Sequence, residues 1–102
     1  MKYLIALLFP VTALAGPSVE TCKTWGEMAE YYATVRYQDT SMEEVLENIR
    51  PNDRRDIAQH IISDVFQLPP MMTKEGKDRM ILNYRNKIFG ECYQHVLTAT
   101  DR

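Results

Sequence analysis

The chain has 102 residues, of which 45% are hydrophobic and 25% are charged, a composition typical of one small globular domain. Its formal net charge at pH 7 is −2. This mild acidity argues against nucleic acid or an anionic membrane as a partner, because both are bound through clustered lysines and arginines.

The chain opens with the pattern of a secretory signal peptide, over residues 1–15. Lys2 supplies a positively charged start, and residues 3–9 form an apolar segment. Ala13 and Ala15 then supply the small side chains that signal peptidase requires before its cleavage point. We therefore expect export of the protein and cleavage after Ala15.

Two kinds of membrane attachment do not fit this start. A spanning helix needs about 20 apolar residues, whereas this segment is shorter and Pro10 interrupts it. A lipoprotein would need a cysteine directly after the Leu-Ala-Gly stretch, and Pro17 occupies that place. We expect a soluble periplasmic or secreted product without a stable membrane anchor, residues 16–102. Without Lys2, its formal charge is −3.

The first expected helix runs from about Ser18 to Tyr37, with Ser18 as a possible N-cap. Apolar residues recur along it every three or four positions, which is the spacing of a buried helix face. They are Cys22, Trp25, Met28 or Ala29, Tyr32 and Val35. The polar residues 38–40 then break the pattern.

The second expected helix has the clearest start. Ser41 and Glu44 have the spacing of a capping box, in which each side chain satisfies a backbone N–H of the other residue. Its apolar face is Val45, Leu46 and Ile49. Pro51 disfavours helical geometry at Arg50, so we expect this helix to stop there.

Two further helices are expected in the second half of the chain. The third begins at Asn52 or Asp53, ends at residues 68–70, and carries a broad apolar stripe of Ile57, Ala58, Ile61, Ile62, Val65 and Phe66. The fourth is capped by Thr73 and runs to about Val96. Its main stripe is Ile81, Tyr84, Ile88 and Cys92, with Met80 and His95 beside it.

The chain has two cysteines, Cys22 and Cys92, which lie 70 positions apart. In an oxidising compartment, an isolated pair is expected to form one intramolecular disulfide. Both residues fall on the inward faces of their expected helices, which supports the pairing. Strand patterns and hairpin turns are absent from the sequence. The predicted fold is therefore all-α, a four-helix bundle-like single domain closed by one disulfide.

No constellation of residues indicates an enzyme, a metal site or a cofactor. His60 lies near the polar side of the third helix, and His95 shares a face with Cys92, whose thiol is expected in the disulfide. The sequence also lacks a glycine-rich phosphate loop, a nucleophile elbow and a haem motif. Three methionines are more typical of irregular packing than of a copper site: Met71, Met72 and Met80.

Several aromatic residues lie away from the main stripes. Two interpretations stay open for them: burial against a neighbouring helix, which is usual in a bundle, or a protein-binding face. Two arginines at the start of the third helix either form a polar rim around such a face or are exposed to solvent without a binding role. The candidate interface residues are Tyr31, Tyr37, Leu82, Phe89 and Tyr93, with Arg54 and Arg55 as the rim.

Three segments carry a resemblance: CKTWGEMAE at 22–30, IISDVFQLP at 61–69 and GEC at 90–92. With the signal peptide, they make the chain similar to small uncharacterised exported two-cysteine helical proteins of proteobacteria and their phages. In architecture it also resembles the small disulfide-bonded lysozyme inhibitors of phages and the acid-stress chaperones of the periplasm. The resemblance implies a fold and a compartment, and no site residue comes with it.

By elimination, the first hypothesis is a small periplasmic protein-binding module that inhibits, or confers immunity against, an envelope enzyme such as a cell-wall hydrolase. The chain is expected to be exported and unanchored, is too small for an evident active site, and has aromatic positions beyond one core stripe. The alternative is an acid-stress chaperone whose dimer loosens as its carboxylates are protonated. A metal carrier or enzyme is the second alternative.

Overall fold

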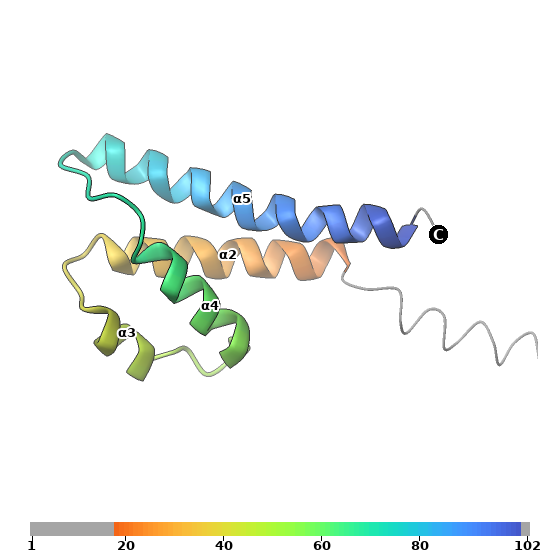
Figure 1. The fold of residues 1–102 in the computed structure, drawn as a ribbon, viewed down its shortest axis with the longest axis horizontal. Helices are drawn as coiled ribbons and strands as arrows, with labels where there is room; N and C mark the ends of the chain where they lie inside the picture. The colour runs from red at the N-terminus through yellow and green to blue at the C-terminus, as the bar shows by residue number, and fades with distance from the viewer. Residues whose placement is uncertain (1–17, 101–102) are drawn as a thin grey trace, which may run out of the picture.

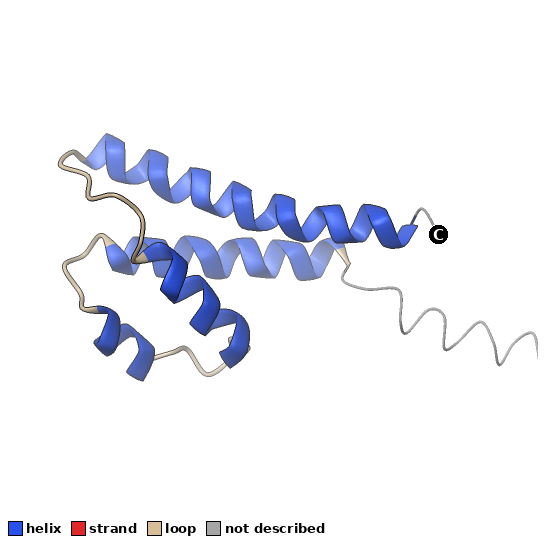
Figure 2. Cartoon of the chain, in the orientation of Figure 1, coloured by secondary structure: helices blue, strands red, loops and turns tan. Residues whose placement is uncertain are grey.

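The computed structural model of the chain describes residues 18–100, so the expected signal peptide at 1–15 lies outside the described residues. Within residues 18–100 there are four helices and no strand (Figure 2). They are α2 (Val19–Arg36), α3 (Met42–Glu47), α4 (Arg55–Val65) and α5 (Lys74–Thr100). The prediction of a mostly helical chain is confirmed.

The two long helices α2 and α5 lie antiparallel, side by side, so that the end of α5 returns to the beginning of α2 (Figure 1). A disulfide joins Cys22 in the first turn of α2 to Cys92 near the end of α5, with a Cα–Cα distance of 5.3 Å. Both cysteines are buried. The predicted pairing is confirmed, and it fixes the register of α2 against α5.

The core lies where α4 packs on α2 and α5. Its largest fully buried side chains include Tyr32 of α2 and Ile61, Ile62 and Val65 of α4. From α5, Tyr84 and Ile88 complete the cluster. Each set recurs at the three and four residue spacing that the sequence shows, so burial of these stripes is the main force that assembles the helices.

The short helix α3 packs on α4 and contributes Val45 to the core. Its six residues make under two turns, whereas α2 and α5 have 18 and 27 residues. The fold is therefore a long antiparallel pair of helices, α2 and α5, with the smaller helices α3 and α4 packed beside it. None of the described helices has a stretch sufficiently long and apolar to span a membrane.

Three helix starts agree with their predicted caps. The Ser18 hydroxyl accepts a hydrogen bond from the Thr21 amide at 3.2 Å, and the Ser41 hydroxyl accepts one from the Glu44 amide at 3.1 Å. At the start of α5, the Thr73 hydroxyl accepts a hydrogen bond from the Gly76 amide at 3.0 Å. These side chains satisfy amides that have no partner inside the helix.

Four boundaries differ from the prediction. Helix α3 ends at Glu47 and not at Arg50, because the Asn48 backbone leaves the helical region and its side chain bonds to the Glu44 carbonyl. Helix α4 begins at Arg55, since Asp53 is held in a tertiary network. Helix α4 ends at Val65, before residues 68–70, and helix α5 continues past Val96 to Thr100. A polar connection at 48–54 is the result of the first two differences.

Candidate functional site

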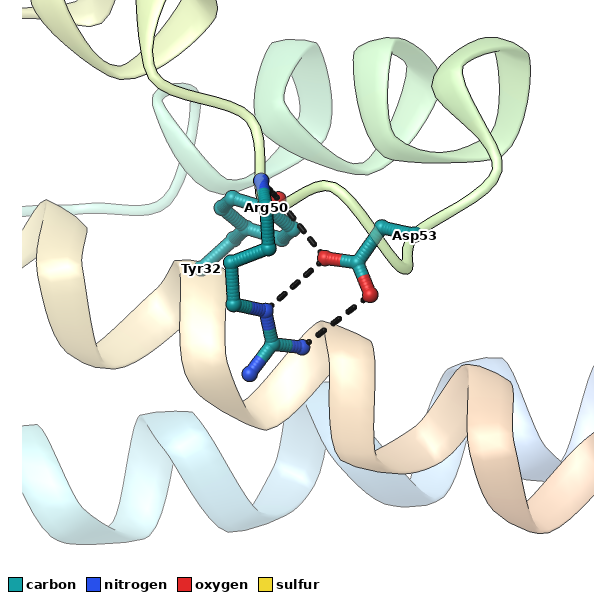
Figure 3. A network of polar contacts seen from close by, with 3 residues as sticks. All are labelled: Tyr32, Arg50 and Asp53. Atoms are coloured by element: carbon teal, nitrogen blue, oxygen red, sulfur yellow. Dashed lines mark hydrogen bonds and ion pairs between the residues drawn. The ribbon is translucent and has the colours of Figure 1, made fainter.

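The 48–54 connection is anchored by a buried tyrosine of α2. The Tyr32 hydroxyl donates a hydrogen bond to Oδ2 of Asp53 at 2.8 Å and accepts one from the Arg50 amide at 3.1 Å (Figure 3). Tyr32 has no exposed surface. One side chain of the core therefore fixes two points of the connection, which we call the 48–54 loop.

Arg50 closes the same network from the solvent side. Its Nε donates to Oδ2 of Asp53 at 2.9 Å and its terminal nitrogen donates to Oδ1 at 3.3 Å. This paired geometry is the strong form of an arginine–carboxylate contact. The guanidinium also lies 3.9 Å from the centroid of the Tyr31 ring, which is a cation–π contact. Tyr31 meets Tyr32 edge to face, with 4.9 Å between the ring centroids.

Tyr32 and Arg50 keep their protonation states at neutral pH. Burial raises the pKa of the Tyr32 hydroxyl above its ordinary value of 10.0. The hydrogen bond from the Arg50 amide lowers this pKa, and the hydrogen bond to the Asp53 carboxylate raises it further. The hydrogen bonds to Asp53 raise the pKa of the Arg50 guanidinium. Tyr32 therefore stays neutral as a donor and Arg50 stays charged at neutral pH.

The loop borders a shallow surface cleft of about 400 Å³, lined by Thr24 and Glu27 of α2 and by residues 50–53. Just beyond it, Arg54 pairs with Asp56 at 2.7 Å, and both side chains are more than half exposed. Arg55 is exposed and has no ion-pair partner among residues 18–98. Tyr31, 38% exposed, lies at the Arg50 end. This surface combines an aromatic side chain with two exposed arginines.

A second surface runs along α5. Leu82, Tyr93 and Leu97 are 57%, 37% and 41% exposed, and the Phe89 ring stacks on Tyr93 with 6.0 Å between the centroids. We call these four residues the α5 stripe. No described helix covers it, so within residues 18–98 the stripe is a partly exposed apolar face and not a contact between helices.

Tyr37 is in neither surface. Its hydroxyl donates to the Pro69 carbonyl at 2.8 Å, and Arg36 beside it donates to the Leu68 carbonyl at 3.0 Å. These two bonds tie the end of α2 to the segment before α5. The seven candidate interface residues therefore divide into three places: Tyr31 with Arg54 and Arg55 near the 48–54 loop, three residues on α5, and Tyr37 in a structural contact.

The two histidines are exposed and lie on separate helices. His60 is 3.6 Å from Asp64 on α4, and Cys92, one turn before His95 on α5, is in the disulfide. Among the described residues no three His, Cys, Asp or Glu side chains are grouped to hold a metal ion.

The sequence interpretation missed Arg50 and Asp53. Their spacing of three residues around Pro51-Asn52 was a usable sign, because an arginine and a carboxylate so placed can pair across a turn. The role of Tyr32 had no local sign, since its partners are 18 and 21 residues away. No family model, curated protein or solved structure matches this chain.

Proposed function

We propose that this protein is an exported protein-binding module that inhibits a cell-wall hydrolase. It would reach the periplasm through the signal peptide at residues 1–15 and bind its target with the 48–54 loop and its flanks. We call this surface the loop face and define it as Tyr31, Arg50, Asn52, Arg54 and Arg55. The observation that carries the proposal is the network in which Tyr32 and Asp53 hold Arg50.

Preorganisation is the first argument for a binding loop. A segment that is already fixed loses little conformational freedom on association, so more of the contact energy appears as affinity. The loop meets this condition because Tyr32 bonds to it at both Arg50 and Asp53.

The composition of the loop face is the second argument. Tyrosine and arginine are enriched among the residues that dominate interface energetics. Arginine also binds carboxylates with paired hydrogen bonds, and most glycoside hydrolases use two carboxylates in an open cleft. A rigid loop that ends in the exposed Arg55, beside the exposed Arg54–Asp56 ion pair, fits a carboxylate-lined cleft of this kind.

The test is inhibition of purified cell-wall hydrolases of two chemical classes. Carboxylate-based muramidases should lose lytic activity on addition of the protein up to equimolar amount, whereas zinc-dependent amidases, whose catalytic group is a metal-bound water, should not. Suppressed aggregation of unrelated proteins at low pH, without any inhibition, would instead support the acid-stress chaperone.

A further inference from the structure

We infer that the α5 stripe binds a second copy of this chain, through an antiparallel contact of the two α5 helices about a two-fold axis. The site lies on a different helix from the loop face and does not rest on the proposed function. Four observations carry it: the exposure of the stripe, the order of its residues, a glycine within it, and the distribution of charge along α5.

The stripe is apolar, and most of it is uncovered by the rest of residues 18–98. Leu82, Tyr93 and Leu97 each keep more than a third of their surface exposed. Phe89 is half-buried because it lies beside Gly26 of α2. With 3.6 residues per turn, the stripe from Leu82 to Leu97 falls on one side of α5. This is the side an adjacent helix would bury.

The residues on this side are arranged symmetrically about the point between Phe89 and Gly90. Leu82 and Leu97 stand seven positions before and after that pair, and Asn86 and Tyr93 stand three positions before and after it. In a two-fold contact, residue i of one copy meets residue j of the other and j meets i. An antiparallel pairing centred here therefore places Leu82 against the other copy's Leu97, and Asn86 against its Tyr93, whose hydroxyl is a suitable partner for an amide.

Gly90 supplies the space that such a contact needs. Glycine inside a helix costs about 1 kcal/mol relative to alanine, and nothing in the described chain requires it, because a Cβ built at Gly90 meets no atom within 4 Å. The antiparallel pairing sets Phe89 of each copy opposite Gly90 of the other. The absent side chain at Gly90 leaves room for the ring, so one residue pair explains both the half-buried aromatic and the glycine.

The charges along the helix favour the antiparallel direction. Residues 74–87 of α5 contain five lysines and arginines and two acidic residues, whereas residues 88–98 contain one acidic residue and no lysine or arginine. The neighbouring first part of α2, residues 19–27, adds two glutamates and one lysine beside that second half, whereas Glu30 pairs with Arg85 in the basic half. An antiparallel pair brings the basic end of each copy to the acidic end of the other, and a parallel pair would oppose like charges.

The contact involves one helix from each copy and is smaller than a standard interface of about 1,600 Å². We therefore expect a weak dimer, populated at concentrations in the upper micromolar range. Sedimentation velocity on the exported chain, from about 1 μM to about 1 mM, should show a concentration-dependent monomer–dimer equilibrium. A chain that stays monomeric throughout this range overturns the inference.

A charge exchange tests the pairing itself. Leu82→Glu and Leu97→Lys should each raise the dimer dissociation constant by about tenfold or more, because a charge then faces an apolar side chain. An equimolar mixture of the two variants should restore dimers. In the mixed dimer, the carboxylate introduced at position 82 of one chain meets the ammonium group introduced at position 97 of the other. The second 82–97 contact keeps both native leucines. Gln94→Glu changes an exposed position about a quarter turn around α5 from the stripe. It is the matched control and should leave the dissociation constant unchanged.

Gly90→Leu is the second variant, because it adds a side chain to open space in the monomer and fills the place of the opposing ring. It should retain the circular dichroism spectrum of the native chain and abolish the dimer. Dimers that persist in Gly90→Leu, or a mixture of Leu82→Glu and Leu97→Lys that remains monomeric, would contradict the antiparallel arrangement.

Discussion

The Tyr32 hydroxyl is the point at which the core meets the 48–54 loop, so Tyr32→Phe is the most informative single substitution. It removes one oxygen and keeps the ring in the core. The change deletes a 2.8 Å hydrogen bond to a carboxylate and a 3.1 Å bond from the Arg50 amide. A bond to a charged group contributes about 1.5 to 3 kcal/mol and a neutral one about 1 kcal/mol.

We therefore expect Tyr32→Phe to lower the free energy of unfolding by about 3 kcal/mol, which for a domain of this size lowers the melting temperature by roughly 10 to 20 °C. Equilibrium denaturation with urea measures this loss. Native-state hydrogen exchange should show in addition that the amides of Arg50 and Asp53 lose protection more than those of α5, because the loop loosens before the helices separate.

Tyr31→Phe is the matched control. It makes the same chemical change at the next residue, whose hydroxyl has no hydrogen bond among the described residues and whose ring stays below Arg50. Its free energy of unfolding should be within about 0.5 kcal/mol of the native value. If Tyr32→Phe costs no more than Tyr31→Phe, the network does not hold the loop and the reasoning is refuted.

Three further predictions concern stability. Replacing both Cys22 and Cys92 by serine should cost about 4 kcal/mol for a loop of 70 residues, measured by urea denaturation, and an unchanged midpoint would contradict the chain-entropy argument. Burial, with the charge of Asp64, raises the pKa of Tyr84 above 10.0, as burial does for Tyr32. The contribution of Tyr84 to stability is complete below pH 10 and is lost as pH rises, because the unfolded tyrosine ionises first; stability should fall above pH 10, and Tyr84→Phe should reduce that slope by about 1.4 kcal/mol per pH unit. Gly90→Ala should raise the stability of the dilute monomer by about 1 kcal/mol, and a thermal melt that shows destabilisation would mean that Gly90 has a role inside the chain.

The sequence was sufficient to predict what depends on periodicity and local chemistry. Cys22 and Cys92 lie in register on the inward faces of two long helices, so the periodic stripes and the disulfide support each other. Ser41 and Glu44 predict a helix start because a capping box involves only neighbouring residues. These features need no knowledge of which helices are adjacent.

The 48–54 loop could not be predicted in the same way. Pro51 indicated only that a helix ends, and the Tyr32 ring had the periodicity of an ordinary core residue. Its hydroxyl acquires a role when α2 and the loop are brought together across 18 to 21 residues. For a related reason, the sequence could not show whether the α5 stripe is buried or exposed. An apolar stripe has the same spacing whether a neighbouring helix covers it or not.

The central proposal, that the loop face inhibits a carboxylate-based cell-wall hydrolase, is tested most directly by charge reversal in a lytic assay. The native protein should abolish muramidase activity near equimolar ratio, and Arg54→Glu combined with Arg55→Glu should weaken inhibition by about a hundredfold. Lys74→Glu combined with Lys87→Glu makes the same change in net charge on exposed positions of α5 and should inhibit like the native protein. Equal inhibition by both double variants, or none by the native protein, would contradict the proposal.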